Sequence, residues 1–341
     1  MTSLMAAEIA ETGARLAEAL RENAGPAALL AARLKALAPP LIATNARGSS
    51  DHAAAFVKFL VETELGLPCA SIGPSIASLY GKRLRLGGAA LISISQSGRS
   101  PDIVAMQHAA REAGALTIAL VNDAASPLAL GAEAALPLCA GAERSVAATK
   151  SALLSMALAC AIVAAWSGGA DLARALAKLP EILARGGQPP PEALLAPLVA
   201  ARSLYVIGRG ATFPVASEAA LKLKETAAIH AEAFSSAEVL HGPAGIVQDG
   251  FPVLAFAPQD AARPGFFETL ERLASFGAAP LLIDARMHPR WPTLTAPRAG
   301  HAALDAIAAL HAFYGVAEVV ALRRGRNPDA PPHLSKVTQT V

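Results

Sequence analysis

The chain has 341 residues, which is enough for two domains of ordinary size. Hydrophobic residues make up 53% of the chain and aromatic residues only 4%, so the core is expected to consist mainly of aliphatic side chains. The formal net charge is +2, charges of both signs are interspersed and there is no basic run, which argues against nucleic acid as a partner.

The three cysteines, Cys69, Cys139 and Cys160, are far apart and form no CxxC pattern. An odd number of widely spaced cysteines argues against a disulfide framework or a zinc site and fits a reducing compartment. The N-terminal stretch carries acidic residues and a helical periodicity, which is not the pattern of a signal peptide. We therefore predict a cytoplasmic protein without a bound metal.

The first half of the chain alternates between short apolar runs and helical stretches. Strands are predicted at residues 41–45, 90–95, 116–121 and 135–138, and helices at residues 51–64, 101–113 and 145–166. Because strands that alternate with helices form βαβ units, a parallel sheet is expected. The uncharged run at residues 151–166 is shorter than the ~20 residues that a membrane helix needs. We interpret it as a buried or dimer-interface helix and expect no membrane partner.

The same order of elements returns after the segment GQPPP at residues 187–191, which is predicted to be a linker. Gly48 and Gly210, each in a turn between a strand and a helix, differ by 162 positions. The apolar runs that begin at Ala90 and Pro252 keep the same offset of 162. Equal spacing over successive elements indicates a duplication. We predict an α/β fold of two doubly wound, flavodoxin-like domains with parallel sheets, in which loops at the carboxyl ends of the strands bind the ligand.

The loop SQSGRSPD, residues 95–102, joins an apolar strand to a helix that begins with proline. Free N–H groups at a helix N-terminus attract an anion, and hydroxyl groups beside a glycine let a phosphate approach closely. The turn Gly48-Ser49-Ser50 has the same character. One such turn would fit ordinary N-capping by serine, but two at adjacent strand ends predict a phosphate site. The second half has Pro258-Gln259-Asp260 at the matching place, so we expect phosphate in the first half only.

The motif GRG at residues 208–210 is a partial match to a dinucleotide-binding fingerprint. Phe213 stands where the third glycine belongs, and the next strand ends at Ala257 rather than at an acidic residue. We therefore expect no nicotinamide cofactor.

The helix predicted at residues 214–228 places Glu218, Lys222 and Glu225 on one face. On a generic helix these residues would form a solvated stripe of ion pairs, but this helix follows a glycine turn at a strand end. His241, which precedes Gly-Pro, is expected to be presented by a turn rather than packed. A carboxylate and an imidazole are the pair that can open a sugar ring and move a proton.

The segments SQSGRSPD, GRGATFPVASEAALKLKE, IHAEAFSSAEVLHGP and PPHLSKVTQTV resemble those of the sugar isomerase (SIS) family. The likeness is to the isomerase half of glutamine–fructose-6-phosphate aminotransferase and to SIS-type glucosamine-6-phosphate deaminases, and it runs from about residue 41 to residue 341. It implies the following division of the chain: an N-terminal helix at residues 1–26, a phosphate-binding SIS domain at 27–170, a linker at 171–195, a catalytic SIS domain at 196–325 and a tail at 326–341.

The resemblance also implies roles for individual residues. Glu225 would carry the proton between C1 and C2, Lys222 would assist this transfer, and His241 would open the ring. His241 would reach the site from the neighbouring subunit of a homodimer, and Lys336 would be able to form a Schiff base with a ketose. The sugar phosphate and its hydroxyls would be bound by Ser49, Ser50, Ser95, Gln96, Ser97, Ser100, Val146 and Ala147.

Three residues depart from the family pattern. Arg47 replaces a small residue in the glycine turn, Arg99 replaces an acid in the phosphate loop, and Ala148 stands where the aminotransferase has a serine. These changes leave the reaction class intact and bear on which sugar fits.

The chain begins Met-Thr-Ser, without the cysteine nucleophile of a glutaminase domain. We therefore predict that it converts glucosamine 6-phosphate and water to fructose 6-phosphate and ammonia. A fructosamine-6-phosphate deglycase, a galactosamine-6-phosphate deaminase and an isomerase-type aminotransferase without its glutaminase domain are alternatives. A non-catalytic sugar-phosphate sensor is an alternative of another class. The expected partner is a phosphorylated amino sugar or ketose.

Overall fold

A computed structural model describes residues 2–336 and divides them into two compact units. The sheet-A unit contains Thr12–Glu143, Lys150–Pro180 and, in the tail, Ser335 and Lys336. The sheet-B unit contains residues 2–11, Arg144–Thr149 and Glu181–Leu334. Two long helices, α1 (Leu4–Leu37) and α7 (Ala170–Ala184), have residues in both units.

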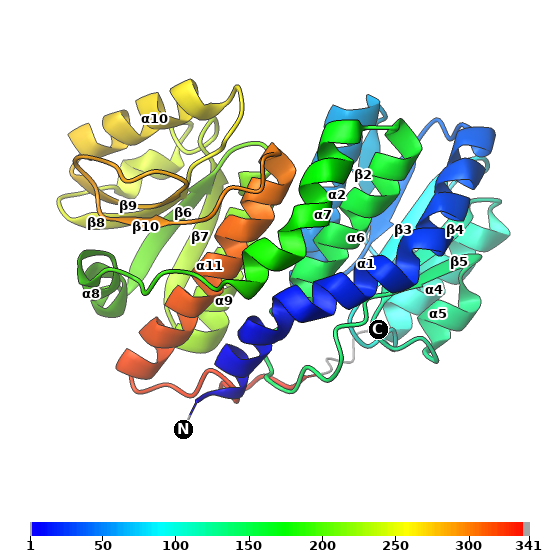
Figure 1. Cartoon of the computed structure of the whole chain (residues 1–341), viewed down its shortest axis with the longest axis horizontal. Helices are drawn as coiled ribbons and strands as arrows, with labels where there is room; N and C mark the ends of the chain where they lie inside the picture. Colours follow the sequence, from blue (N-terminus) through cyan, green and yellow to red (C-terminus); the bar gives the residue numbers. More distant parts are fainter. Residues whose placement is uncertain (1, 337–341) are drawn as a thin grey trace. The chain divides into compact units, whose positions relative to one another are not determined.

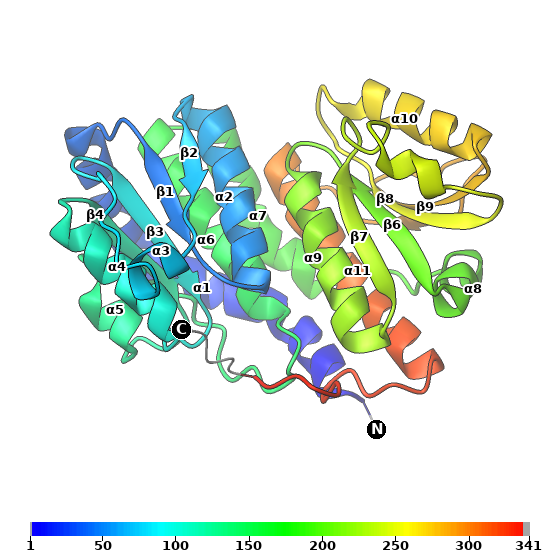
Figure 2. The same ribbon diagram turned by 180° about the vertical axis from the view of Figure 1, so that it is seen from behind.

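Sheet A has five parallel strands in the order β2-β1-β3-β4-β5. The strands are β1 (Ile42–Asn45), β2 (Cys69–Ser71), β3 (Ala90–Ser95), β4 (Leu116–Val121) and β5 (Ala134–Pro137). The helices of this unit are α2 (Ser49–Leu65), α3 (Ser75–Ser78), α4 (Pro101–Glu112), α5 (Pro127–Gly131) and α6 (Lys150–Ser167). Helices α2 and α6 pack together on one face of the sheet, and α4 and α5 cover the other face (Figures 1 and 2).

Sheet B repeats this arrangement in the order β10-β9-β8-β6-β7, again with all strands parallel. Its strands are β6 (Ser203–Gly208), β7 (His230–Ser235), β8 (Phe251–Phe256), β9 (Ala278–Asp284) and β10 (Thr293–Thr295). The helices are α8 (Glu192–Ala200), α9 (Thr212–Ala227), the 3-10 turn η1 (Pro243–Ile246), α10 (Arg263–Ser275) and α11 (Ala302–Arg323). Figure 2 shows α9 beside α11 on one face of sheet B and α10 on the opposite face.

The predicted duplication is confirmed by this topology. When β6 to β10 are matched in sequence order to β1 to β5, both sheets have the order 2-1-3-4-5. This is the doubly wound, flavodoxin-like arrangement, in which the chain reverses its direction of winding between the first and third strands. The carboxyl ends of those two strands are where such a sheet binds its ligand. In sheet A they carry the two serine turns, and in sheet B they lead into α9 and α10.

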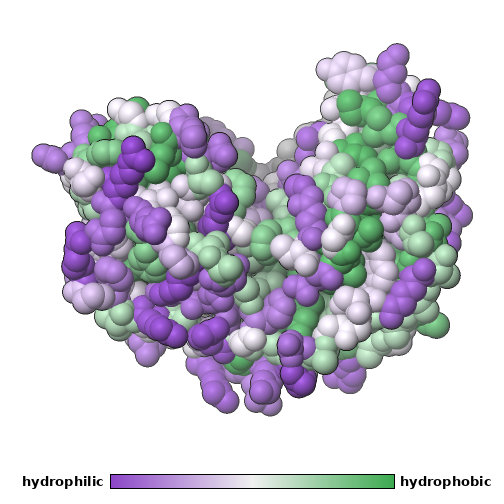
Figure 3. Space-filling model, turned by 90° about the horizontal axis from the view of Figure 1, so that it is seen from above, coloured by the Kyte–Doolittle hydropathy of each residue, from purple (hydrophilic) through white to green (hydrophobic). Residues whose placement is uncertain are grey.

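The central strands of sheet A form where the sequence predicts because they are apolar along their whole length. Every residue of β3 and β4 is buried, and both strands have the predicted bounds. Such continuous apolar runs are typical of parallel strands with helices on both faces. The core of sheet B is built around Tyr205, Phe251 and Phe266. Polar and apolar side chains are interspersed on the face drawn in Figure 3.

The helix predicted at residues 145–166 begins five residues later than expected, at Lys150. Contacts distant in the sequence hold the preceding backbone in an irregular path. The N–H groups of Arg144 and Ser145 donate to the carboxylate of Glu8, and the N–H of Val146 donates to the carbonyl oxygen of Asp329 at 3.0 Å. These contacts tie residues 144–146 to Glu8 and Asp329, and the helix begins only after them.

Helices α6 and α11 are long and apolar enough to cross a membrane by length and composition alone. In each of them, however, 83% of the residues in that apolar stretch are buried within the protein. A helix that is apolar on all sides and covered by protein is a core helix. The interpretation of residues 151–166 as a buried helix is therefore confirmed.

Candidate active site

The two serine turns are neighbours in sheet A. Strands β1 and β3 pair in parallel, with Asn45 opposite Ser93, so the turns that follow them leave the same edge of the sheet. Ser49 and Ser50 are the first two residues of α2, and Ser100 is the N-cap of α4 with Pro101 as the first helical residue. The predicted phosphate residues of these turns are thus brought together at two helix N-termini, where N–H groups favour an anion.

Gly98 shapes the turn between β3 and α4. Its φ is +63°, and a Cβ placed there would come within 2.1 Å of the Ser126 hydroxyl oxygen. The Gly98 N–H donates to the hydroxyl of Ser95 at 3.0 Å, and the Arg99 N–H donates to the hydroxyl of Ser97 at 3.3 Å. Ser95 and Ser97 therefore order the turn while each keeps a hydroxyl proton that can be donated to a ligand.

Both arginines that depart from the family pattern make ion pairs at this edge. Arg47 donates from Nε and Nη2 to Oδ2 of Asp102, at 3.0 and 2.8 Å, and the Asp102 side chain is fully buried in the first turn of α4. Arg99 pairs with the partly exposed Asp123 at 2.7 Å. The Arg99–Asp123 contact and the backbone N–H of Ala125 hold the pKa of Asp123 below its usual value. The serine turns are thus flanked by two guanidinium groups.

The matching loop of sheet B is organised around a carboxylate. The buried side chain of Asp284 accepts hydrogen bonds from Gln259 at 2.7 Å and from Arg263 at 2.8 and 2.6 Å. Gln259 and Arg263 are therefore engaged with a carboxylate of the protein itself. That only the first half binds phosphate stays a prediction.

Helix α9 carries the three charged residues that the spacing placed on one face. The side chains of Glu218 and Lys222 are fully buried, whereas that of Glu225 is 21% exposed. Lys222 Nζ lies 3.4 Å from Glu218 and donates a hydrogen bond to Glu225. Lys224, two residues further along, is exposed. One buried lysine is thus shared by two carboxylates, of which only Glu225 reaches the surface.

The charge state of Lys222 follows from this pairing. Burial lowers the pKa of Lys222, but the charges of Glu218 and Glu225 and their hydrogen bonds outweigh burial, so the pKa is raised above 10.5. Lys222 therefore carries a positive charge at neutral pH. A fixed cation beside a partly exposed carboxylate can stabilise negative charge on a substrate while the carboxylate moves a proton.

Tyr314 on α11 completes this group and is not among the residues predicted from the sequence. Its side chain is fully buried, and its hydroxyl donates to Oε1 of Glu218 at 3.2 Å. Glu218 and Tyr314 are 96 positions apart and belong to no shared motif. The one available signal was the position of Glu218 itself, one turn before Lys222 on the predicted face.

His241 is exposed, in a turn fixed by Tyr205. The N–H of His241 donates to the carbonyl oxygen of Glu238 at 2.9 Å, and Gly242 has a φ of +131°. The buried Tyr205 donates its hydroxyl to the carbonyl oxygen of Pro243 at 2.6 Å. Burial raises the pKa of Tyr205, with a smaller contribution from Glu232, so the hydroxyl remains protonated and able to donate. The prediction that His241 is presented by a turn agrees with this geometry.

Lys336, Val146 and Ala147 are the remaining residues that were predicted to belong to the site. Lys336 Nζ lies 3.1 Å from Glu143 Oε2 in the sheet-A unit, and the lysine side chain is 24% exposed. In the sheet-B unit, Val146 uses its N–H for Asp329, and Ala147 is buried. The roles assigned to Lys336, Val146 and Ala147 stay predictions.

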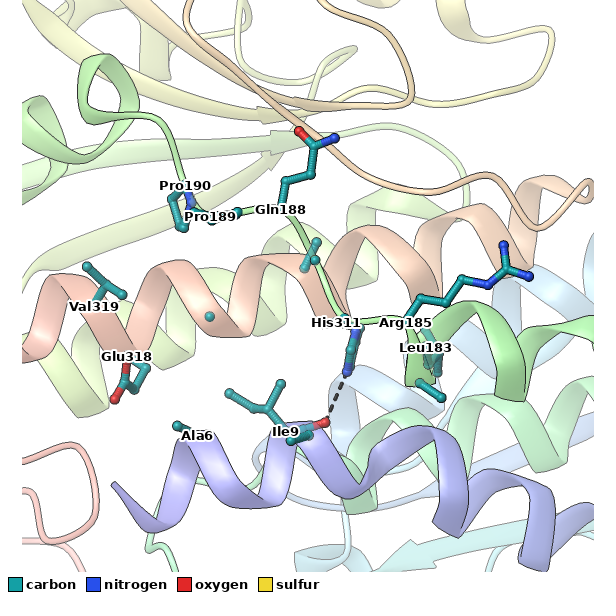
Figure 4. A pocket seen from close by; sticks show the side chains of 16 residues that line it. Ala6, Ile9, Leu183, Arg185, Gln188, Pro189, Pro190, His311, Glu318 and Val319 are labelled. Carbon is teal, nitrogen blue, oxygen red and sulfur yellow. Dashed lines mark hydrogen bonds between the residues drawn. The ribbon is translucent and has the colours of Figure 1, made fainter. Parts of the chain in front are cut away.

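A cavity of about 380 Å³ lies within the sheet-B unit, between the start of α1, the loop after α7 and helix α11 (Figure 4). His311 projects into it and contacts the carbonyl oxygen of Ile9 at 3.1 Å. None of the predicted site residues lines this cavity. Within residues 2–336 there is no group of three or more histidine, cysteine or acidic residues that could hold a metal ion.

Comparison with known proteins identifies the family of the chain. A family model described as the SIS domain matches residues 40–165 and 198–314, one match for each sheet. The glutamine–fructose-6-phosphate aminotransferase (isomerizing) of Halobacterium salinarum is 34% identical over 308 residues, which are 85% of this chain and 50% of that protein. The corresponding protein of Bradyrhizobium diazoefficiens is 31% identical over 260 residues, covering 72% of this chain and 42% of that protein. The chain spans about half the length of the curated relatives it matches or less.

Solved structures of full-length similarity also exist. A protein from Silicibacter pomeroyi DSS-3, provisionally described as a phosphosugar isomerase, is 44% identical with a TM-score of 0.90, over 96% of this chain and 100% of that one. The glucosamine-6-phosphate deaminase of Thermotoga maritima is 18% identical with a TM-score of 0.76, over 99% of this chain and 100% of that one. At that identity the second comparison shows a common fold alone.

Proposed function

The chain belongs to the SIS domain family, and from that premise we propose that it is an aldose–ketose isomerase of phosphorylated amino sugars that releases ammonia. The specific reaction proposed is the conversion of glucosamine 6-phosphate and water to fructose 6-phosphate and ammonia. The structure described as a phosphosugar isomerase, which is 44% identical over almost the whole chain, supports the substrate class.

The observation that carries the proposal is the arrangement of Lys222 and Glu225 on α9. Glu225 is the one member of the buried charged group that reaches the surface, and it is hydrogen-bonded to a lysine whose pKa is lowered by burial and raised, in balance, by the two carboxylates. A solvated ion pair would need neither the burial nor the second carboxylate. A partly exposed carboxylate held beside a permanent cation is suited to take a proton from carbon and return it.

The proposed sequence of steps begins with His241, which opens the pyranose ring. Glu225 then takes the proton from C2 of the open-chain aldehyde and returns it to C1, while the C1 oxygen gains a proton and the C2 amine loses one. The C2–N bond becomes the double bond of a ketimine, water adds at C2, and ammonia leaves as the C2 carbonyl of fructose 6-phosphate forms. Lys222 stabilises the negative charge that develops on oxygen while the proton is in transit.

The serine turns of sheet A are the proposed phosphate site. Two adjacent helix N-termini, the hydroxyls of Ser95 and Ser97, and the neighbouring Arg47 and Arg99 support this assignment. Lys336 is proposed as the lysine that can react with a ketose. A cytoplasmic homodimer, in which His241 is contributed to the partner's site, is also part of the proposal.

Ammonia release assayed with glucosamine 6-phosphate, galactosamine 6-phosphate and a fructosamine 6-phosphate distinguishes the proposed enzyme from its nearest alternatives. We expect release from glucosamine 6-phosphate, with fructose 6-phosphate as the second product. Fructose 6-phosphate formation from glucose 6-phosphate without ammonia would indicate a plain isomerase. Binding of fructose 6-phosphate without turnover of any of these sugars would overturn the proposal in favour of a sensor.

A further inference from the structure

Helix α11 adds a residue to the charged group of α9 that neither the family motifs nor the site predictions include. We propose that Tyr314 is a positioning residue that holds the Glu218 carboxylate against Lys222, so that Lys222 keeps a counter-ion while Glu225 is protonated during turnover. This inference rests on the proposed function, because it assigns Glu225 as the group that carries the proton.

The side chain of Lys222 has no exposed surface, and the carboxylates of Glu218 and Glu225 on the same helix both act on its charge. An ammonium group that loses its counter-ions in such a place becomes strongly unfavourable and gives up its proton. A buried carboxylate that stays ionised therefore helps to keep Lys222 charged throughout the reaction.

Glu225 does not meet this requirement during turnover. A carboxylate that takes a proton from C2 is neutral until it returns the proton to C1, and for that interval it contributes no negative charge to Lys222. Glu218 is fully buried and is not exposed to a substrate, so it can serve as the permanent counter-ion. The 21% exposure of Glu225 and the complete burial of Glu218 thus separate the two roles.

Tyr314 keeps Glu218 in the ionised form. A hydrogen bond donated to a carboxylate favours its charged state, and the Tyr314 hydroxyl donates to Glu218 Oε1 at 3.2 Å. The tyrosine lies on α11, which packs against α9, and its ring is fully buried, so the position of the hydroxyl is fixed by the core. The same Oε1 atom is 3.4 Å from Lys222 Nζ, which completes a path from Tyr314 through Glu218 to the lysine.

The first test is made on variants of the full-length chain. Tyr314→Phe removes one hydroxyl and keeps the ring in the core. We expect kcat to fall about tenfold, since a hydrogen bond to a charged group is worth roughly that factor, while KM stays within about twofold. The pH profile of kcat should narrow, because Glu218 accepts a proton more readily and Lys222 loses one more readily. Ser155→Ala, which removes a buried hydroxyl bonded to the Ser151 carbonyl oxygen in the other unit, is the matched control.

The second test does not depend on activity. Nuclear magnetic resonance of the 15N-lysine-labelled protein follows the Lys222 ammonium group as the pH is raised. Glu225→Gln mimics the protonated state of Glu225, and in this variant we expect Lys222 to remain charged at neutral pH. In the double variant Glu225→Gln/Tyr314→Phe, the lysine should titrate at a lower pH than in either single variant.

Each outcome decides the inference. Loss of the ammonium signal at neutral pH in Glu225→Gln, or an unchanged Lys222 titration in Tyr314→Phe, overturns it, and so does an equal effect of Ser155→Ala. If the wild-type protein shows no turnover of any sugar phosphate, the proposed function fails. The titration of Lys222 in the Glu225→Gln and Tyr314→Phe proteins still distinguishes a held counter-ion from an ordinary core tyrosine.

Discussion

The guanidinium group of Arg47 lies 2.8 Å from the carboxylate of Asp102 and joins the turn after β1 to the first turn of α4. The acid is fully buried, whereas 47% of the arginine side chain is exposed. The ion pair therefore fixes two separate turns, each of which carries serines of the proposed phosphate site. Arg99 makes a second ion pair nearby, but its partner Asp123 is partly exposed. This contrast allows a matched test of the two arginines.

Arg47→Met should destabilise the protein by about 1–3 kcal/mol, because it leaves a buried carboxylate without its charged partner. Arg99→Met should cost less than about 1 kcal/mol, since exposed ion pairs contribute little. Urea unfolding of both variants at pH 7 measures the difference. Equal losses in the two variants would contradict the assignment of Arg47 as the partner on which Asp102 depends.

Glu225→Gln should lower kcat by at least about 100-fold, which is typical when a general base is removed. Binding of fructose 6-phosphate should change little, because the phosphate is proposed to be held by the serine turns. Calorimetric titration and initial rates provide the two measurements, with the exposed Glu232→Gln as a control variant. A parallel loss of binding and rate would mean that Glu225 holds the sugar and does not move the proton.

Lys222→Met should destabilise the protein by about 3–5 kcal/mol, because two carboxylates, one of them fully buried, lose their shared cation. Lys224→Met, on the exposed side of the same helix, should change the free energy of unfolding by less than about 0.5 kcal/mol. Adding Glu218→Gln to Lys222→Met should recover part of the lost free energy of unfolding, because it removes the fully buried carboxylate that has lost its cation. Denaturant unfolding curves of all four proteins at pH 7 check this ordering.

The ion pairs of Lys222 with Glu218 and Glu225 predict that the free energy of unfolding depends on pH in the alkaline range. The folded-state pKa of Lys222 is raised above 10.5, so the ion pairs stabilise the fold fully below about pH 10.5. Their contribution is lost as the pH rises through the folded value. The stability difference between the wild-type protein and Lys222→Met should therefore be constant from pH 7 to about pH 10 and decrease above about pH 10.5. A difference that grows with pH would have the wrong sign.

The burial of His311 predicts that the free energy of unfolding also depends on pH in the acidic range. Burial lowers its pKa below 6.5, although the contact with the carbonyl oxygen of Ile9 opposes this, so the imidazole is neutral in the fold. The unfolded chain binds the proton more readily, and stability should therefore fall as the pH drops below about 6.5. His311→Gln keeps a donor for Ile9 and should remove this component. His108→Gln, at a side chain that is 72% exposed, should leave the pH dependence as it is in the wild-type protein.

The sequence predicts the apolar strands of sheet A, and the edge strand β5 to within one residue, better than it predicts β2 and β7. Strands β3 and β4 have the predicted bounds because they are unbroken apolar runs buried on both faces. The edge strand β2, which has three residues, and the edge strand β7, in which His230 and Glu232 are exposed, are not predicted from the sequence. Short, half-polar edge strands carry little periodic signal, and pairing with a neighbour decides their structure.

In the candidate site, too, features set by neighbouring residues can be predicted, and features set by residues far away in the sequence cannot. The spacing of Glu218, Lys222 and Glu225 fixes their common face, because a helix repeats every 3.6 residues. The exposure of Glu225 and the burial of Glu218 depend on what α11 covers, and no local pattern encodes that. The irregular path before Lys150 likewise depends on Glu8 and Asp329, which lie far away in the sequence.

The Asp284–Arg263 contact distinguishes the two repeats. The turn after β3 carries serines, whereas in sheet B the side chain of Arg263, the first residue of α10, pairs with Asp284 at the end of β9. Two repeats with one strand order thus have different polar side chains at equivalent edges. If the first repeat alone holds the phosphate, as proposed, the second is free to supply other groups to the reaction.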